Sequence, residues 1–582
     1  MTPLHLLDDF PPIKTAEWEA AIARDLKGAD YEKRLIWPTD EGFIGKPYYR
    51  AADLKGLAML DRAPGEFPYR RSSRATGDWT IREIVEANRH QTANRAACDA
   101  VAAGAEAIAF RGLEFHSATD LELSLANLDE IPIHFEDGGE QVLQLLLQCP
   151  GRLPVSALIS TGFDPLANLQ FAAEVLRAAP PRFVPFTIHA AAFEQAGATA
   201  VEEIGLALAA GVEFLAAMTD RGVDPAPAAA AIEFSFAVGS RYFFQIAKLR
   251  AFRMLWARAQ EKFGIPSQCA RARIAARTSS WNKTVYDPHV NILRATTEAM
   301  TAILGGADMV TVAPFDDCFR QPAEASRRLA RNTQLLLKHE GSLGRVADPG
   351  GGSYYIEALT DFLAGAAWKT MQDIEARGGY LKAEQDGSLS QILARSCAAR
   401  EQAVERRRRP LIGTTQFADS GERALDRVAE KRMLAVRRGA LAYEKLRMRT
   451  ERHAAHGGKT PRVLLAEIGD PKMRAARSAF ALNFFACAGF AITTKPFRKT
   501  AEIIAAEADL IVLCSSNAEY PAIAADLMRK MKELRRSTPV VIAGNPENAD
   551  QLKAIGVADF VHLRSNPLEV LVRWQQQLGI ED

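Results

Sequence analysis

Cysteine is scarce in this sequence, and long apolar runs are absent. The seven cysteines are scattered, odd in number and never spaced as C-x-x-C, which argues against a disulfide framework and a zinc site. No stretch approaches the ~18 consecutive apolar residues of a membrane-spanning helix. The N-terminal MTPLHLLDDFPPIKTAEWEA lacks the apolar segment of a secretory signal. We therefore expect a cytoplasmic protein with no metal site and no membrane partner.

An excess of charge of either sign is also missing. The 72 lysines and arginines nearly balance the 71 aspartates and glutamates, and the formal net charge is +1, so no global field attracts nucleic acid. Basic residues do concentrate in two stretches, 406–409 and 427–452. Their pattern is mostly helical, and we interpret them as a solvated connector with internal ion pairs in preference to an interaction surface.

The clearest structural pattern lies near the middle of the chain. Two apolar runs, 272–279 and 307–314, flank a helical pattern at about 290–304, in which apolar residues recur every three or four positions. Asp287-Pro288 disfavours helix before this pattern, and Gly305-Gly306 ends it. The segment is predicted to form one strand-helix-strand unit.

Eight apolar runs of this kind alternate with helical patterns from Trp79 onward. Parallel strands covered by helices read as near-continuous apolar runs, and eight strand-helix units close a (β/α)8 barrel. We predict that residues 79–370 form such an α/β barrel, with any site at the C-terminal ends of its strands. The predicted strands are 106–112, 131–136, 154–160, 183–189, 212–219, 232–238, 272–279 and 307–314.

A second α/β pattern follows the linker sequence HAAHGGKTP at 453–461. Its five strand-helix units predict a flavodoxin-like, doubly wound domain over 461–582, with a ligand crevice at the carboxyl ends of the central strands. The other segments are assigned to an N-terminal arm, 1–78, and a helical linker, 371–460. The predicted strands are 463–466, 491–494, 510–514, 540–543 and 560–562, and the helices lie near 472–486, 500–507, 522–532, 547–555 and 568–578.

A run of three glycines and a serine at 350–353 invites comparison with phosphate-binding loops. A P-loop needs a following lysine and a serine or threonine, and Tyr354-Tyr355 stand there instead. We predict a tight turn between helices.

Two long stretches carry a family resemblance: RTSSWNKTVYDPHVNILRATTEAMTAILGGAD at 277–308 and ARNTQLLLKHEGSLGRVADPGGGSYYIEALT at 330–360. They resemble the methylmalonyl-CoA mutase family, a group of adenosylcobalamin-dependent acyl-CoA isomerases. The resemblance continues through GEFPYRRSSRATGDWTIRE at 65–83 and AFEQAGATAVEEIGLALAAGVEFL at 192–215, and it covers nearly the whole chain. It implies an acyl-CoA mutase barrel followed by a domain of the cobalamin-binding type.

The resemblance also indicates where a cobalamin would bind. Members that bind it present Asp-x-His-x-x-Gly after the first strand of the C-terminal domain; the histidine coordinates cobalt and the aspartate orients the imidazole. Here Asp470 is kept, but Lys472 and Ala475 stand at the histidine and glycine positions. A protonated lysine has no lone pair to offer a metal.

The other cofactor-facing positions are partly kept. Ser515 stands where the family has a pair of serines, and Gly544 stands where it has the second of two glycines. In contrast, His-Leu-Arg-Ser at 562–565 replaces a loop of the Gly-Pro-Gly-Thr type. We expect a degenerate domain that binds no cobalamin. A cobalamin site with a different axial ligand is the alternative.

Two positions in the barrel also carry residues that differ from those of the catalytically active family members. The family carries tyrosine where this chain has Arg74, and histidine where it has Ala192. That histidine hydrogen-bonds the thioester carbonyl as the acyl group migrates and stabilises the charge that develops there, which alanine cannot do. His189, three residues earlier, is interpreted as a core or loop histidine. The resemblance therefore implies no catalytic residue in this chain.

These substitutions lead us to expect the small, non-catalytic subunit of a heterodimeric enzyme that interconverts methylmalonyl-CoA and succinyl-CoA. Its partner would be a homologous large subunit that holds adenosylcobalamin and the acyl-CoA, and that the arm at 1–78 would contact. Two alternatives stay open: a self-sufficient mutase with altered cobalt ligation, and a non-catalytic barrel that binds acyl-CoA. A neighbouring gene for a paralogue with an intact Asp-x-His-x-x-Gly would favour the first interpretation.

Overall fold

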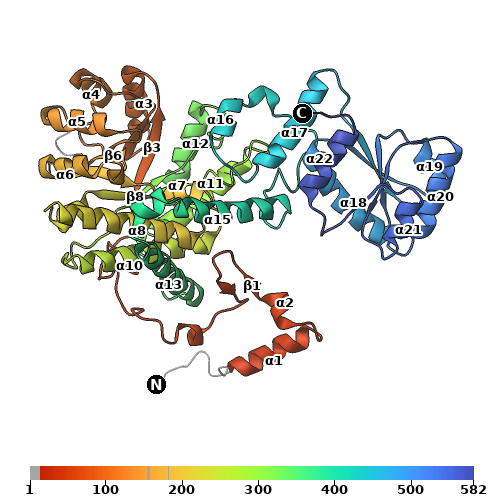
Figure 1. The fold of residues 1–582 in the computed structure, drawn as a ribbon, viewed down its shortest axis with the longest axis horizontal. Coiled ribbons are helices and arrows are strands. Elements are labelled where there is room, and N and C mark those ends of the chain that lie inside the picture. The colour runs from red at the N-terminus through yellow and green to blue at the C-terminus, as the bar shows by residue number, and fades with distance from the viewer. Residues whose placement is uncertain (1–12, 154–156, 181–182, 582) are drawn as a thin grey trace, which may run out of the picture.

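A computed structural model describes residues 13–153, 157–180 and 183–581. Figure 1 shows two separate α/β bodies, a barrel formed by the first two thirds of the chain and a smaller sheet domain at the C-terminus. A group of helices joins them, and an extended N-terminal segment lies beneath the gap between the two bodies. Within the described residues, no helix is both long and apolar enough to cross a membrane.

The barrel is closed and entirely parallel. Its eight strands pair in chain order, and β10 pairs with β3 to complete the ring. The strands are β3 (Thr80–Glu86), β4 (Ala107–Arg111), β5 (Ile133–Phe135), β6 (Ile159–Phe163), β7 (Phe183–Ile188), β8 (Ile232–Val238), β9 (Ile274–Thr278) and β10 (Met309–Thr311). The helices around it are α3 (His90–Ala102), α4 (Ala118–Leu125), α5 (Glu140–Gln148), α6 (Leu169–Ala178), α7 (Ala190–Gln195), α8 (Ala200–Asp220), α9 (Pro225–Ala230), α10 (Tyr242–Lys262), α11 (Val290–Leu304), α12 (Glu324–Leu335) and α13 (Tyr354–Glu375). The predicted barrel is therefore confirmed.

One predicted strand is wrong and one strand was missed, although the total of eight is right. Residues 212–219 lie inside helix α8, which is buried on nearly all sides, so its apolar residues show no helical stripe. Thr199 begins this helix with a capping box to Glu202. The missed strand is β3, whose sequence TIREIVE mixes apolar and charged residues without a regular alternation. The strand predicted at 154–160 begins later, at Ile159, and residues 154–156 lie outside the described residues.

An ion pair fills the centre of the barrel. Arg82 on β3 donates two hydrogen bonds of 2.8 Å to the carboxylate of Glu233 on β8, and both side chains are buried. Burial by itself would raise the pKa of Glu233, but the charge and hydrogen bonds of Arg82 outweigh it and lower this pKa to about 2. Because β3 and β8 are not neighbours in the ring, the pair crosses the lumen. The remaining space in the lumen is a cavity of only about 40 Å³.

His134 on β5 lies beside this ion pair. Its Nδ1 is 2.9 Å from the hydroxyl of Ser160, and the ring is buried. Burial, and then the positive charge of Arg82, lower the pKa of His134 to about 4. The barrel core thus contains a neutral imidazole next to a charged pair.

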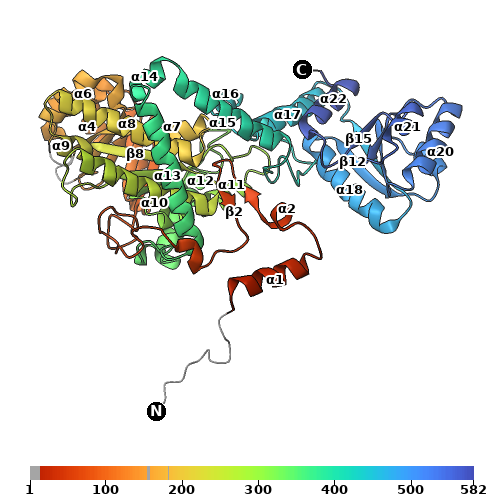
Figure 2. The same ribbon diagram turned by 60° about the horizontal axis from the view of Figure 1, so that its bottom comes forward.

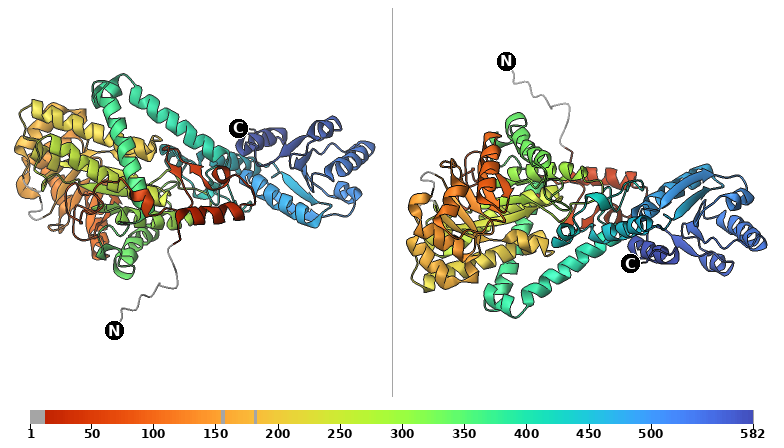
Figure 3. Two further views of the ribbon diagram at one scale, coloured as in Figure 1. Left: turned by 90° about the horizontal axis from the view of Figure 1, so that it is seen from below. Right: turned by 90° about the horizontal axis from the view of Figure 1, so that it is seen from above.

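The connecting helices are clamped to one loop of the barrel. They are α14 (Tyr380–Gln385), α15 (Ser388–Glu405), α16 (Glu430–Ala435) and α17 (Leu441–Ala455). Glu444 of α17 accepts the backbone N–H of Val285 at 2.8 Å and two hydrogen bonds from Arg438, and Glu451 accepts the hydroxyl of Tyr286 at 2.7 Å. Figure 3 shows α15 extending from the barrel towards the C-terminal domain. Arg432 and Arg438 of the basic stretch are therefore paired inside the protein, as expected, but Arg438 is buried and not solvated.

The C-terminal domain has the predicted doubly wound topology. Its five parallel strands lie in the order β12-β11-β13-β14-β15, which is the flavodoxin-like order 2-1-3-4-5. The elements are β11 (Arg462–Glu467), α18 (Pro471–Phe485), β12 (Ala491–Pro496), α19 (Thr500–Ala505), β13 (Leu510–Cys514), α20 (Tyr520–Glu533), β14 (Val540–Ala543), α21 (Ala549–Ala554), β15 (Asp559–Val561) and α22 (Pro567–Gln577).

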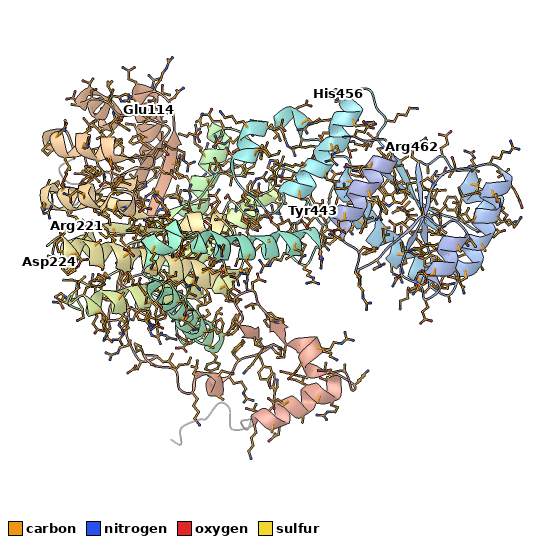
Figure 4. All side chains as sticks on the ribbon, in the orientation of Figure 1. Glu114, Arg221, Asp224, Tyr443, His456 and Arg462 are labelled. Carbon is orange, nitrogen blue, oxygen red and sulfur yellow. The ribbon has the colours of Figure 1, made fainter. Side chains whose placement is uncertain are left out.

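Helix α17 belongs structurally to both bodies. Tyr443 packs in the core of the C-terminal domain. Figure 4 shows it at the N-terminal end of α17, where the connecting helices meet this domain. The side-chain amide of Gln575 on α22 donates to the carbonyl of Leu446 at 2.6 Å and to the hydroxyl of Thr450 at 2.7 Å. The helix that is fixed to the barrel therefore also holds the C-terminal domain.

The glycine run at 350–353 is a turn before α13. Ser353 is the N-cap residue of this helix, and its hydroxyl accepts the N–H of Ile356. A Cβ at Gly351 would overlap the guanidinium of Arg71. The arm and the barrel therefore meet at this turn, whose shape depends on a residue without a side chain.

The arm begins with α1 (Thr15–Asp25) and α2 (Tyr31–Leu35), neither of which buries a side chain. A short hairpin follows, formed by β1 (Trp37–Pro38) and β2 (Ile44–Gly45). In Figure 2, α1 extends away from the two α/β bodies. Among the described residues of the arm, Phe43 in the hairpin loop is the first to be buried.

We predict that the clamp on α17 contributes strongly to stability. Replacing buried Glu444 (Glu444→Gln) leaves the buried Arg438 guanidinium without its counter-charge, and the expected cost in free energy of unfolding is roughly 3–5 kcal/mol. The neighbouring pair of Arg437 with Glu401 is half exposed, so Glu401→Gln should cost less than about 1 kcal/mol. Urea denaturation of the three proteins tests this, and equal midpoints for the two variants would contradict it.

We further predict that His134 makes stability depend on pH. The folded protein keeps this side chain neutral down to about pH 4, whereas the unfolded side chain titrates near 6.5. Between these values the unfolded state binds more protons, so the free energy of unfolding should rise with pH by roughly 3 kcal/mol in total. His134→Gln should remove this increment, and His456→Gln, at an exposed position, should retain it. Parallel urea titrations from pH 4 to 7 provide the measurement.

Candidate functional site

The C-terminal mouth of the barrel encloses a cavity of about 360 Å³. Residues from the ends of β4, β7, β8, β9 and β10 and from α7 line it, as the barrel fold predicts for a site. The polar lining residues are Arg111, His189, Glu194, Gln195, Ser235, Arg277, Thr278, Ser279, Ser280, Lys283 and Asp317.

The charged groups at this mouth are paired with one another. Glu136 accepts hydrogen bonds from Arg111 at 2.9 and 3.0 Å and from Arg277 at 2.8 Å. Burial opposes ionisation, but the two guanidinium groups hold the pKa of Glu136 well below its usual range. Lys283 donates to Glu298 at 2.7 Å. The charged side chains at these strand ends therefore form a network in which the charges are paired with each other.

Ala192 lies at this mouth. It belongs to the short helix α7, is exposed, and lines the cavity. Its methyl group has no hydrogen-bond donor. His189 lies directly after β7 and precedes α7, and its Nε2 donates to the carbonyl of Gly162 at 2.7 Å. His189 is therefore a loop histidine at the rim of the mouth, with its donor engaged by the backbone.

Arg74 lies at the opposite end of the barrel. Its guanidinium donates to the carbonyl of Ala307 at 3.1 Å and lies 3.5 Å from Asp308, just before β10 begins. A second cavity, of about 300 Å³, is found there and is also lined by Arg271 and Arg273. The fold thus separates Arg74 and Ala192, because the segment before β3 passes beneath the barrel and α7 lies above it.

The predicted cobalamin residues gather at the carboxyl edge of the C-terminal sheet. Asp470 is the N-cap of α18, and its Oδ1 accepts the backbone N–H of Met473 at 2.7 Å. Pro471 occupies the first helical position, where its fixed φ favours helix. Lys472 and Ala475 consequently lie in the first turns of α18, both exposed. The Oδ1 atom of the Asp470 carboxylate is thus engaged in capping α18.

Glu519 fills the space between this loop and the next one. It accepts hydrogen bonds from the hydroxyls of Ser515 at 2.9 Å and Ser516 at 2.7 Å, and from the backbone N–H of Asp470 at 3.1 Å. These hydrogen bonds, with that of Asp470 first, lower the pKa of Glu519 to about 2. A Cβ at Gly469 would overlap its carboxylate.

Sequence reasoning did not identify Glu519. The available signal was the Ser-x-x-Glu spacing of Ser516 and Glu519 just before a helix, which is typical of a capping box. Its closeness to Asp470, 49 residues earlier, depends on the packing of two parallel strands.

The far side of the crevice is closed in the same manner. Gly544 lies beneath Arg477, whose guanidinium donates to Asn517 at 3.1 Å. The hydroxyl of Tyr520 donates to the carbonyl of Ala543 at 2.7 Å. In the loop at 562–565, the backbone N–H of Arg564 donates to Nδ1 of His562 at 3.1 Å. These contacts do not fit a bound corrin with its nucleotide tail, because the groups that would meet the cofactor already bond to each other.

Among the described residues, no three histidine, cysteine or acidic side chains gather in a way that could hold a metal ion.

Comparison with known proteins agrees with this architecture. The family model for methylmalonyl-CoA mutase matches residues 166–460, half of the chain. A methylmalonyl-CoA mutase small subunit from Porphyromonas gingivalis is 36% identical and covers 99% of both chains. One from Streptomyces virginiae is 32% identical over 99% of this chain and 98% of its own. A protein of Rhizobium meliloti named methylmalonyl-CoA mutase is 29% identical over 70% of this chain and 65% of its own length. The chain belongs to the methylmalonyl-CoA mutase family.

Proposed function

We propose that this chain is the small, non-catalytic subunit of a cytoplasmic, heterodimeric methylmalonyl-CoA mutase. Its partner is a homologous large subunit that holds adenosylcobalamin and the acyl-CoA and interconverts methylmalonyl-CoA and succinyl-CoA. The observation that carries the proposal is the self-pairing of both candidate sites. At the barrel mouth, Arg111 and Arg277 bond to Glu136. At the crevice, the hydroxyls of Ser515 and Ser516 and the backbone N–H of Asp470 bond to Glu519.

The crevice supports the part of the proposal that concerns cobalamin. A cofactor would have to displace Glu519 from three donors and release Asp470 from the end of α18. It would then meet Lys472, whose ammonium offers no lone pair to cobalt while protonated. An N-cap side chain is worth typically ~1 kcal/mol and a hydrogen bond to a charged group about 1.5–3 kcal/mol. The free energy of each contact that is lost opposes cobalamin binding.

The barrel supports the part that concerns catalysis. The Arg82–Glu233 pair leaves only about 40 Å³ free in the lumen, so an acyl group could be held only in the cavity of about 360 Å³ at the mouth. At the mouth, Ala192 offers no donor to a thioester carbonyl, so charge developing there would not be stabilised. The chain therefore contributes no reacting group. Its role is to support the partner's barrel and its cofactor, and to help exclude water from a radical site.

A second candidate function is a coenzyme A-binding barrel without catalysis. The cavity at the N-terminal end of the barrel favours it, because Arg74, Arg271 and Arg273 line a space of about 300 Å³ and arginine suits phosphate groups. Calorimetric titration of the isolated chain with coenzyme A separates the two candidates. Saturable binding that is lost in Arg271→Gln supports the second candidate, and no detectable heat supports the first.

We predict that the purified chain takes up no stoichiometric cobalamin. The double variant Lys472→His, Ala475→Gly should also remain empty, since Glu519 and the loop at 562–565 still close the crevice. Equilibrium dialysis with adenosylcobalamin measures the uptake, and a large subunit of the family serves as the positive control. Saturable uptake by the wild-type chain would refute this prediction, if the cobalamin absorbance also changed as expected for coordination of cobalt by a protein nitrogen.

We predict that α1 is needed for assembly but not for folding. Because Glu41 and Phe43 already pack on the barrel, a test deletion should end before the hairpin, at residue 30. The shortened chain should keep its melting temperature, since α1 buries no side chain. Its affinity for the large subunit should fall at least tenfold, about 1.4 kcal/mol, with a matching loss of mutase activity at limiting concentration. Full activity and unchanged affinity would show that the interface lies elsewhere.

A further inference from the structure

A cavity of about 600 Å³ lies where the connecting helices meet the C-terminal domain. It is larger than the cavities at the two ends of the barrel, and its volume falls within the ~300–1,000 Å³ of small-molecule sites. Residues of α16, of α17 and of the chain after α22 line it. In Figures 1 and 2, α17 lies between α16 and α22. Neither of the candidate sites described above includes this cavity.

One wall of the cavity is a basic face of α17. Its members recur mostly three or four positions apart, so they lie on one side of the helix. They are Lys445, Arg449, Arg452, His453 and His456. Figure 4 shows His456 at the end of α17 that is opposite Tyr443. From Lys445 to Arg452 the helix rises by about 10 Å. A row of this length suits an extended group with several negative charges better than a single phosphate.

The charge of this face is only partly neutralised by the two carboxylates that line the cavity, those of Glu430 and Glu581. Arg452 donates to Glu430 of α16 at 2.9 Å, but the two side chains are 45% and 61% exposed, and such pairs are weak. Lys445 is exposed and forms no hydrogen bond or ion pair with another described residue. Its ammonium group is therefore available to a ligand.

Another part of the lining is apolar. Met433 of α16 and Met448 of α17 line the cavity and belong to the same buried cluster, and Leu434 lines it with its side chain exposed. Methionine sulfur makes favourable contacts with aromatic rings. A ligand that fits both parts of the lining combines several negative charges with a flat aromatic ring.

The walls of the cavity are held in place by other contacts of the chain. Arg432 of α16 donates to Glu86 at 2.8 Å and to Asp317 at 2.6 Å, which fixes α16 to the barrel. Gln575 of α22 donates to the carbonyl of Leu446 in α17 at 2.6 Å. A site whose walls are already ordered loses less conformational entropy when a ligand binds.

We propose that this cavity binds a nucleoside diphosphate. The phosphates lie on the basic face of α17, since lysine and arginine are the usual partners of phosphate oxygens, and the base lies against Met433, Leu434 and Met448. The inference goes beyond the proposed function and does not rest on it, because every group that it uses belongs to this chain. Coenzyme A carries the same chemistry in its nucleotide part, so the test has to distinguish the two sources.

The test is calorimetric titration of the full-length chain with ADP. Lys445→Gln removes a charge that has no partner in the chain, and we expect it to weaken ADP binding at least tenfold. Leu434→Ser removes apolar contact with the base and should weaken ADP binding at least threefold. Lys431→Gln is the matched control, because Lys431 is exposed on α16 and does not line the cavity; it should bind ADP within twofold of wild type. Unchanged melting temperatures of the three variants without ligand would show that folding is intact.

Two further ligands identify what the cavity recognises. Tripolyphosphate, which has the charges but no base, should bind wild type at least tenfold more weakly than ADP, and Leu434→Ser should not change its affinity. Arg271→Gln should leave ADP binding unchanged, which distinguishes this cavity from the one at the N-terminal end of the barrel.

Three results would overturn the proposal. The first is the absence of saturable ADP binding at millimolar concentration, or equal affinity of wild type and Lys445→Gln. The second is binding of tripolyphosphate as tight as that of ADP, which would show a site for polyanions without recognition of a base. The third is binding of coenzyme A at least tenfold tighter than that of ADP and lost in Lys445→Gln, which would assign the cavity to coenzyme A and not to a free nucleotide.

Discussion

The ion pair between Arg82 and Glu233 is the constraint on which the barrel depends. Both groups are buried in the lumen, where an unpaired charge would cost several kcal/mol, so each requires the other. A barrel of this kind is usually filled by branched apolar side chains. Here a bidentate pair crosses it, with His134 kept neutral beside it. The barrel is therefore a closed core, and its mouth is a network of satisfied charges.

The same principle operates in the C-terminal domain. Glu519 is ionised because the hydroxyls of two serines and a backbone N–H meet it, and Asp470 is fixed because it caps a helix. Doubly wound sheets place ligands at this edge. In this chain, polar side chains at this edge of the sheet bond to one another. The fold of the family has been retained, while Glu136 at the barrel mouth and Glu519 at the crevice bond to groups of the same chain.

The connections show how such a fold can serve assembly. Glu444 and Glu451 tie α17 to the barrel, and Gln575 ties the C-terminal domain to α17. The two bodies are therefore held by a shared helix. The arm begins with helices that bury nothing, then becomes rigid at the hairpin, where Glu41 and Phe43 attach it.

The sequence by itself determined the alternation of strands and helices, the doubly wound C-terminal domain, the family, and the substitutions at Lys472, Ala475 and Ala192. These follow from local pattern and from residue chemistry at single positions. It failed at β3 and at α8, because a strand with charged residues facing a polar lumen and a helix buried all round both lose their usual periodicity. Only the tertiary structure decided that Arg82 meets Glu233, 151 residues later, that Glu519 closes the crevice, and that the hairpin lies on α10 and α13. The physical reason is that the fold brings together buried charged or aromatic side chains that are far apart in the sequence. Local sequence patterns do not indicate which two residues will pair.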